Sequence, residues 1–296
     1  MTNDHLIFNR NRVRLHRDRA STTLGQSDFM LETMAVRLAD RLGDVTRRFP
    51  MALDLGAHDG RLAKHLPATA GIETLVQSDL SWRMIAQGVG LRVVADEEFI
   101  PFADDMFDLV LSCGSLHWVN DLPGALIQIQ RILKPDGLFL AMLPGGETLK
   151  ELRSAFEQAE MALSGGISPR ISPFVDVRDA GSLLQRAGFA LPVVDSETLT
   201  VMYEHPLKLL KDLRGMGESN ALLHSRKGLM PCSLLMGMAD IYLRQCMDKD
   251  GRIPATFELV TLTAWKPHAS QQQPAKRGSG KIHLGAALGG DYSHTK

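Results

Sequence analysis

The sequence has few cysteines, no long apolar run and almost no net charge. Its three cysteines, Cys113, Cys232 and Cys246, are odd in number and widely spaced. This argues against a disulfide framework or a structural zinc site and favours a reducing compartment, the cytoplasm. No apolar run reaches the roughly 18 residues of a membrane helix, so a membrane-spanning protein is excluded. Lys and Arg number 33 against 34 Asp and Glu, which argues against a nucleic-acid-binding protein.

A chain of 296 residues with 44% hydrophobic and 23% charged residues has an ordinary globular composition and buries enough surface to need no covalent cross-links. Its first part is dense in arginine: Arg10, Arg12, Arg14, Arg17 and Arg19. Acidic residues interrupt this series, and neither an apolar segment nor a small-residue cleavage site follows. A basic helix packed against the domain is therefore favoured over a targeting peptide.

The middle of the chain alternates short apolar runs with helical stretches. The run 51–55 ends at a glycine and is typical of a buried strand that leads into a tight turn. Further strands are predicted at 74–77, 92–94, 109–112 and 138–143, and helices at 31–42 and 122–133. The second helix is expected to stop at 134–137, where a proline and an Asp-Gly pair follow it. This alternation predicts an α/β fold, a parallel sheet with helices on both faces.

Beyond residue 146 the pattern changes to longer helical stretches with two strands. Helices are predicted at 149–163, 180–187, 206–213 and 232–247, and strands at 193–203 and 257–265. We therefore divide the chain into three parts. A basic and helical segment covers 1–48, one α/β domain covers 49–268 with helical insertions at 147–190 and 205–250, and a polar tail, expected to be mobile, covers 269–296.

The turn after the first strand carries the clearest ligand signal. From Asp54 to Gly60 it reads Asp-Leu-Gly-Ala-His-Asp-Gly. Glycines in this place let the backbone approach a ligand, and the next helix offers unpaired N–H groups. His58 and Arg61 stand where a dinucleotide fingerprint needs glycine, and no Gly-Lys-Ser/Thr phosphate loop occurs. A dinucleotide or nucleoside triphosphate is therefore disfavoured, while a merely tight connection stays an alternative.

Acidic residues end the next two predicted strands. Asp79 lies about 20 residues beyond Gly60, a spacing at which an acid accepts hydrogen bonds from both ribose hydroxyls. Asp96 and Glu97 follow the third strand, where a carboxylate can accept from an adenine amino group. Each acid alone is typical of a solvated strand end or a helix cap. Together they would lie at the carboxyl edge of one sheet, where open α/β sheets bind ligands.

These motifs together resemble the class I S-adenosylmethionine-dependent methyltransferases. The matching stretches span about residues 49–143 and are Asp54-x-Gly56-x-x-x-Gly60, Asp79, Asp96-Glu97, Pro101-Phe102, Phe107-Asp108-Leu109-Val110 and Leu133-Lys134-Pro135-Asp136-Gly137. The resemblance implies a Rossmann-like seven-stranded sheet in the order 3-2-1-4-5-7-6, with the last strand antiparallel and with helical additions. The family's turn usually has glycine where His58 stands.

The resemblance also implies S-adenosyl-L-methionine as the cofactor and assigns its contacts. Gly56, Ala57 and Gly60 would line the methionine part, Asp79 would bind the ribose, and Asp96 and Glu97 would bind the adenine. Asp54 and Cys113, at the ends of the first and fourth strands, complete the expected cofactor set.

Stretches outside the cofactor core are similar to one branch of this superfamily. They are His117-Trp118-Val119-Asn120-Asp121-Leu122-Pro123, Ile171-Ser172-Pro173-Phe174, Gly215-Met216-Gly217-Glu218-Ser219-Asn220, Pro254-Ala255-Thr256-Phe257 and Arg277-Gly278-Ser279. That branch contains a mitochondrial respiratory complex I assembly factor with a methyltransferase-like fold, and bacterial relatives. The activity reported for it is hydroxylation of an arginine in a complex I subunit, so the fold does not fix the reaction.

The acceptor is expected beside residues 113–120. A methyl transfer needs the acceptor held about 3–3.5 Å from the methyl group and a base only where the acceptor must lose a proton. His117 is the candidate base, and Trp118 can wall the acceptor pocket. It stays open whether His117 instead caps a helix or packs on Trp118, and whether Trp118 is core. Cys113 is interpreted as a buried filler, because no His–acid pair at a known spacing would activate it.

Two further residue patterns bear on the acceptor and on a metal. Glu218 and Asn220 can hold a guanidinium, since carboxylates bind arginine in a planar fork, although a plain turn explains them equally well. His16-Arg17-Asp18 is the one His-x-acid match to an iron-binding pattern. It is attributed to chance and expected away from the cleft, so no metal site is predicted.

The sequence thus predicts an S-adenosylmethionine-dependent methyltransferase acting on a protein or small-molecule acceptor. The alternatives are an arginine hydroxylase acting on a respiratory complex I subunit and a non-catalytic assembly chaperone that binds the cofactor for stability. Local arginines leave contact with an acidic partner or a membrane surface open, but no helix amphipathic enough to assert a membrane contact is evident. The oligomeric state is not indicated.

Overall fold

The computed structural model describes residues 6–226, 228–272 and 278–280, so most of the tail predicted to be mobile lies outside the described residues. The helices are α1 (Arg10–Ala20), α2 (Phe29–Gly43), α3 (Trp82–Ile85), α4 (Leu122–Ile132), α5 (Lys150–Ser164), α6 (Val177–Arg186), α7 (Pro206–Met216) and α8 (Cys232–Cys246). The strands are β1 (Met51–Leu55), β2 (Thr74–Asp79), β3 (Leu91–Val94), β4 (Phe107–Cys113), β5 (Leu133–Pro144), β6 (Ala190–Tyr203) and β7 (Ile253–Trp265). Within the described ranges, no helix is long and apolar enough to cross a bilayer.

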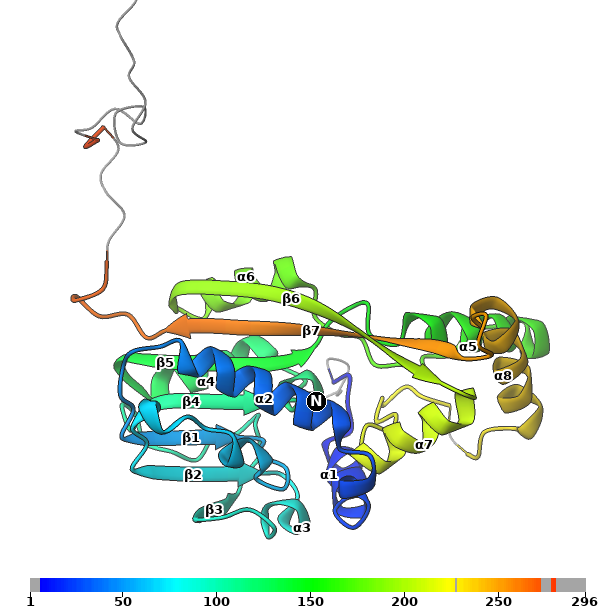
Figure 1. Cartoon of the computed structure of the whole chain (residues 1–296), viewed down its shortest axis with the longest axis horizontal. Helices are drawn as coiled ribbons and strands as arrows, with labels where there is room; N and C mark the ends of the chain where they lie inside the picture. The colour runs from blue at the N-terminus through cyan, green and yellow to red at the C-terminus, as the bar shows by residue number, and fades with distance from the viewer. Residues whose placement is uncertain (1–5, 227, 273–277, 281–296) are drawn as a thin grey trace, which may run out of the picture.

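The seven strands form one sheet in the order β3-β2-β1-β4-β5-β7-β6 (Figure 1). Strands β1 to β5 pair in parallel, and β7 runs antiparallel to both β5 and β6. The fold class and the strand order that the resemblance implied are therefore confirmed. Parallel pairing brings the carboxyl ends of β1, β2, β3 and β4 to one edge of the sheet.

Helices cover both faces of the sheet, and the central strands bury alternate residues on each. In β5, Leu138 and Leu140 pack with α2 on one face, while Phe139 and Ala141 pack with α4 and α6 on the other. Because both faces of this stretch are buried, its sequence is a continuous apolar run instead of an alternation of apolar and polar residues.

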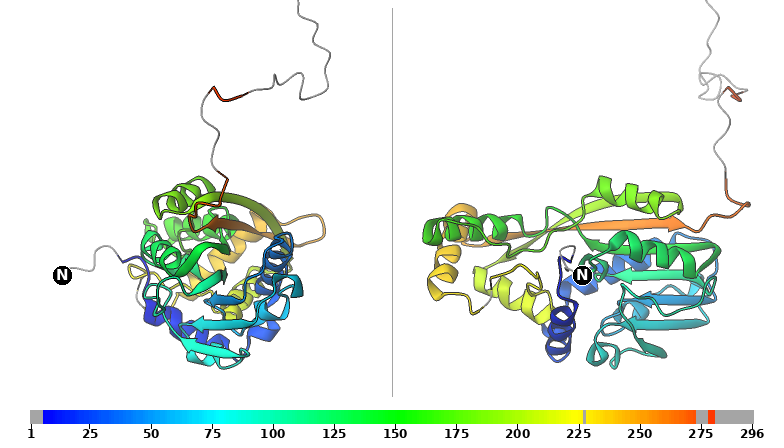
Figure 2. Two further views of the ribbon diagram at one scale, coloured as in Figure 1. Left: turned by 90° about the vertical axis from the view of Figure 1, so that its left-hand side faces the viewer. Right: turned by 180° about the vertical axis from the view of Figure 1, so that it is seen from behind.

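Strands β6 and β7 extend beyond the parallel part of the sheet as a two-stranded ribbon. Residues 253–258 of β7 pair with β6 alone. The helices α5, α7 and α8 gather at this far end, and α1 lies between them and the parallel strands (Figures 1 and 2). The carboxyl edge of the parallel strands therefore faces a second, mainly helical layer.

The structure corrects two expected boundaries. The segment 134–137, expected to be a turn after α4, lies within β5 as a bulge, since Phe107 pairs with Leu133 and Leu109 already pairs with Leu138. Asp136 provides the positive φ of +64° that the bulge needs. The last strand starts at Ile253 instead of 257, although a proline follows at once.

Candidate cofactor crevice and acceptor cavity

The turn after β1 depends on left-handed backbone conformations. Gly56, His58 and Gly60 have φ values of +72°, +50° and +77°. A Cβ atom on Gly56 would lie 1.9 Å from the Ser115 Oγ, so this position admits only glycine. His58 adopts its conformation at a cost of about 1–2 kcal/mol. Its buried ring lies 3.1 Å from the Gly114 carbonyl and thereby ties the turn to the end of β4.

Asp79, at the end of β2, is fully buried and accepts three hydrogen bonds. Its Oδ1 accepts from the Ser81 backbone N–H at 2.7 Å. Its Oδ2 accepts from the His58 backbone N–H at 3.0 Å and from Arg17 Nη1 at 3.1 Å. Each carboxylate oxygen has about two acceptor positions, so Oδ2 is saturated and Oδ1 keeps one position.

Arg17 of α1 is the buried counter-ion of this edge, with a relative exposure of 1%. Its Nη1 also donates to Glu97 Oε1 at 2.8 Å, so one guanidinium bridges the ends of β2 and β3. Burial opposes the ionisation of Glu97, but Arg17 and Arg10 outweigh it and lower the pKa of Glu97 to about 2. The Nε and Nη2 of Arg17 have no hydrogen-bond partner among the described residues.

Arg10 makes a second bridge from α1 to the same edge. It donates to Asp96 Oδ1 at 2.6 Å, to Glu97 Oε2 and to the Trp118 carbonyl at 3.1 Å. The three predicted acids therefore do converge, as expected of residues at neighbouring strand ends. Sequence reasoning missed that two arginines of α1 hold them, although buried carboxylates require a nearby cation.

Asp54, at the end of β1, has no such cation. Its side chain is fully buried, and neither carboxylate oxygen has a hydrogen-bond partner among the described residues. Burial raises the pKa of Asp54 to about 7, although the nearby Gln77 amide acts in the opposite direction. Folding therefore favours the protonated form of this carboxyl.

The Asp54→Asn variant tests this protonation. A folded-state pKa above the unfolded value of 3.8 lowers stability as pH rises from about 4 to about 7, by roughly 4 kcal/mol for such a shift. Relative to the parent protein, we expect the variant to gain stability over this interval, measured by urea unfolding at several pH values. A difference between the two proteins that does not change with pH would contradict the protonated carboxyl.

Cys113 lies at the end of β4, packed in the core that α2 covers. Burial raises the pKa of its thiol, which makes it a poor nucleophile at neutral pH. This agrees with its interpretation as a buried filler. Its predicted cofactor contact stays a prediction.

A cavity of about 870 Å³ lies between the edge of the sheet and the helical layer. Its walls come from α1, α2, α5, α7, the turn after β4, the loop 168–174, the end of β5, part of β7, and the described part of the segment 218–231. His117 and Trp118 line it, as predicted for the acceptor pocket, whereas none of the predicted cofactor contacts does. The acids and the cavity are therefore separate, with α1 and the Gly114 end of β4 between them.

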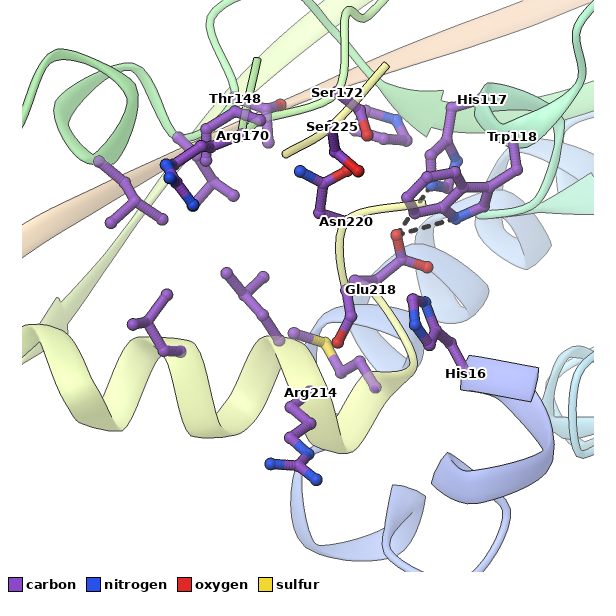
Figure 3. A pocket seen from close by; sticks show the side chains of 18 of the residues that line it. His16, His117, Trp118, Thr148, Arg170, Ser172, Arg214, Glu218, Asn220 and Ser225 are labelled. Carbon is purple, nitrogen blue, oxygen red and sulfur yellow. Dashed lines mark hydrogen bonds and ion pairs between the residues drawn. The ribbon is translucent and has the colours of Figure 1, made fainter. Parts of the chain in front are cut away.

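Glu218 organises the predicted acceptor residues (Figure 3). Its Oε2 lies 2.9 Å from His117 Nε2 and accepts from Trp118 Nε1 at 3.0 Å. Burial opposes ionisation of Glu218, but the attraction and hydrogen bond of His117 outweigh it and hold the pKa below its usual value. The carboxylate is thus ionised at neutral pH, and among the described residues no hydrogen bond involves its Oε1.

The end of α7 brings Glu218 to this place. Gly217 caps the helix with a φ of +87°, and the Glu218 N–H donates to the Leu213 carbonyl at 2.8 Å. The segment therefore begins as the turn that ends α7. Asn220, proposed with Glu218 as a guanidinium ligand, instead holds the loop through Leu222 N–H and the Pro169 carbonyl. His117 packs on Trp118 and does not cap α4, which Asp121 caps.

His16 lines the same cavity, so the expectation that it lies away from the cleft is wrong. Asp18 faces a different way from His16, because residues two apart on a helix do not share a face. Asp18 accepts a hydrogen bond from the Ser81 hydroxyl at 2.6 Å. Among the described residues, no group of three or more His, Cys, Asp or Glu side chains is placed to hold a metal ion.

Relatives match nearly the whole chain. It is 44% identical to the mitochondrial arginine hydroxylase NDUFAF5 of Danio rerio over 93% of this chain and 88% of that protein, and 43% identical to that of Homo sapiens over 87% and 76%. The chain belongs to the NDUFAF5 family. It is also 32% identical to malonyl-[acyl-carrier protein] O-methyltransferase of Methylovorus sp. (strain MP688), over 93% of this chain and 95% of that protein.

The chain has a methyltransferase fold. A methyltransferase domain model matches residues 53–141. The solved YcgJ protein of Bacillus subtilis superposes with a TM-score of 0.55 at 14% identity, over 78% of this chain and 98% of that chain, which shows the shared fold alone. The expected family is therefore confirmed, and the chain is an S-adenosylmethionine-dependent enzyme.

The carboxylates at the ends of β2 and β3 are hydrogen-bond acceptors of the kind that this cofactor requires. Asp79 and Glu97 accept hydrogen bonds from guanidinium N–H groups in the structure. In the predicted cofactor contacts, the same carboxylates would accept hydrogen bonds from ribose hydroxyls and an adenine amino group. Because Arg17 saturates Oδ2 of Asp79, a ribose can engage both oxygens only after that guanidinium moves. The Nε and Nη2 groups of Arg17 have no hydrogen-bond partner among the described residues, so they can donate to another acceptor.

Proposed function

We propose that this protein modifies an arginine side chain of a protein partner, and that the modification is a hydroxylation. The observation that carries the proposal is the Glu218 carboxylate in the cavity, fixed by His117 and Trp118. A carboxylate with one engaged oxygen and one open oxygen can receive a guanidinium through charge-assisted hydrogen bonds. The relatives at 43–44% identity are named arginine hydroxylases, which agrees with such an acceptor.

The side chains around Glu218 would position the acceptor. The lowered pKa of Glu218 keeps it charged, so binding a guanidinium requires no prior loss of a proton. Nδ1 of His117 is buried without a partner among the described residues, so this ring is placed to hold a proton beside the acceptor. The Phe174 ring also lies near His117, with 6.0 Å between the ring centroids.

The reactants set hydroxylation and methylation apart. When bound, S-adenosylmethionine supplies a methyl group activated by its sulfonium. A hydroxylation instead inserts one oxygen atom of dioxygen and releases the other as water, which requires two electrons from an external donor and two protons. Where the acceptor is an arginine, the role of this chain in either reaction is to bind the guanidinium, orient it and exclude water from it.

The proposed partner is a subunit of respiratory complex I, as the resemblance of the sequence implies. Mass spectrometry of the complex purified from cells with and without this protein tests the proposal. A gain of one oxygen on an arginine, lost on deletion, is the expected result. An arginine that is identical in both samples would contradict the proposal, and a complex that then still fails to assemble would favour the chaperone.

Methylation is the second candidate, favoured by the malonyl-[acyl-carrier protein] O-methyltransferase relatives, which match 89–95% of this chain. The same spectra separate methylation of an arginine of the complex from its hydroxylation, since a methylated product gains one carbon and two hydrogens. Radiolabel transferred from S-adenosylmethionine to a cell extract would support this candidate directly.

Glu218→Gln is expected to lower kcat/KM for the arginine substrate by about ten- to a hundredfold, because it removes a charge-assisted contact of about 1.5–3 kcal/mol. The amide keeps the shape and can still accept from Trp118. Glu157→Gln is the matched control on the exposed side of α5. Unchanged kcat/KM in a folded Glu218→Gln protein would remove Glu218 from the acceptor site.

A further inference from the structure

We propose that the arginine accepted by the cavity lies in an acidic segment of the partner, and that four arginines at the cavity mouth bind its carboxylates. These are Arg12, Arg19, Arg214 and Arg226, called here the rim arginines. The inference rests on the proposed function, because it specifies the surroundings of the same acceptor. It adds a charge requirement that Glu218 alone does not impose.

The rim arginines come from three elements that meet at the mouth. Two lie on α1, one lies near the end of α7, and one lies in the loop that follows α7. The α1 and α7 ends abut, since a Cβ on Gly217 would lie 3.4 Å from the Ala20 Cβ. Arg19, Arg214 and Arg226 are exposed. Arg12 is half-buried and fixed by Ser225 Oγ at 3.1 Å.

None of the rim arginines forms an ion pair with a described residue, although the other arginines near this site do. Arg10 and Arg17 are paired with the acids of the sheet edge, and Arg170 is paired with Glu160. The chain as a whole carries a net charge of only −1. Four unpaired cations at one mouth are therefore a local feature and not a consequence of composition.

This charge arrangement selects the flanks of the substrate. Inside the cavity, Glu218 is the one carboxylate among the described lining residues, and it attracts a guanidinium. Outside, the rim arginines repel a free cation on its way in. A segment with acidic residues on either side of the arginine matches both signs, since its carboxylates meet the rim while its guanidinium reaches Glu218.

An anionic membrane surface matches the rim less well. A bilayer would bring negative head groups against the arginines, but it presents no guanidinium for the carboxylate within the cavity. The cavity thus has positive charge at its mouth, from the rim arginines, and negative charge inside, from Glu218. This arrangement favours a peptide that carries both signs over a lipid surface.

Fluorescence anisotropy with the full-length protein and labelled peptides of about eleven residues tests the proposal, a length chosen to span the mouth with extended chain on both sides. The first peptide has a central arginine with glutamates on both sides, the second has serines on both sides, and the third has the acidic flanks with glutamine at the centre. We expect the first to bind most tightly and its affinity to fall as salt is raised.

The double variant Arg19→Ser, Arg214→Ser is expected to weaken the acidic arginine peptide about tenfold and to leave the serine-flanked peptide unchanged, since exposed ion pairs contribute modestly. Arg14→Ser is the matched control, an exposed arginine of α1 that does not line the cavity. Circular dichroism verifies that each variant is folded.

The outcomes separate the two proposals. If the acidic and serine-flanked arginine peptides bind equally, or the double variant matches the control, the rim proposal is overturned while the arginine acceptor stands. If the acidic peptides with arginine and with glutamine bind equally and both depend on the rim, the rim stands and the arginine acceptor fails. Rim-dependent binding to phosphatidylserine vesicles, with no binding of any peptide, overturns both in favour of a membrane surface.

Discussion

Replacing Arg17 with methionine is expected to lower the free energy of unfolding by about 3–5 kcal/mol. Arg17 is almost fully buried, and it bridges Asp79 and Glu97, which are both fully buried. Methionine fills a similar volume but leaves Asp79 without a counter-ion and Glu97 with Arg10 alone. Urea unfolding at neutral pH, followed by circular dichroism, measures the loss. Arg14→Met, at an exposed position of the same helix, is expected to change stability by less than about 0.5 kcal/mol.

The acid dependence of stability provides an independent measure of the same ion pair. A folded pKa of about 2 for Glu97, below its usual 4.5, gives stability that is present above pH 4.5 and lost as pH falls toward 2. This loss amounts to about 3 kcal/mol for a shift of that size. In the Arg17→Met protein the acid-induced loss should shrink. If its slope equals that of the parent protein, Arg17 is not the main partner of Glu97.

The central sheet was predictable because its strands have unambiguous local signals. Each strand that is buried on both faces is a short apolar run, and the prolines and glycines between the runs interrupt helical spacing. The convergence of Asp79, Asp96 and Glu97 followed from the same reasoning, since parallel strands end at one edge. The strand order came from family resemblance and not from the periodicity.

The start of β7 was missed because Pro254 looks like a strand breaker. The structure explains why it is tolerated. The first residues of β7 pair with β6 but extend beyond the end of β5, so one edge there has no neighbouring strand and needs no N–H donor. Proline is compatible with such an edge, and no local pattern reveals that a neighbouring strand has ended.

The role of α1 was missed for a different reason. Arginines occupy every second or third position of α1, so the helix has no clear apolar stripe. The spacing therefore does not distinguish the buried Arg17 from the exposed Arg14 and Arg19. Which one is buried depends on partners 62 and 80 positions away in the chain. The available signal was indirect, since several acids predicted at one buried edge require cations.

Asp79→Asn is expected to weaken the binding of S-adenosylmethionine about a hundredfold. The predicted ribose contact would make charge-assisted hydrogen bonds to the carboxylate, and the loss of about 3 kcal/mol corresponds to that factor. Asparagine keeps the shape but only one acceptor oxygen, so its amide nitrogen would face either the Ser81 N–H or the His58 and Arg17 donors as a like donor. Isothermal titration of the full-length protein measures the affinity, and Asp104→Asn, an exposed ion-pair partner of Arg131, is the control.

Arg17→Met gives this experiment a counterpart with the opposite sign. Because Arg17 saturates Oδ2 of Asp79, removing the guanidinium frees an acceptor position, and the variant should bind the cofactor more tightly than the parent protein. Weaker binding by a folded Arg17→Met protein would mean that this arginine helps to hold the cofactor and does not compete with it. Unchanged affinity in Asp79→Asn would remove the ribose from the end of β2. The competition at Asp79 therefore stands only if the two substitutions act in opposite directions on one affinity.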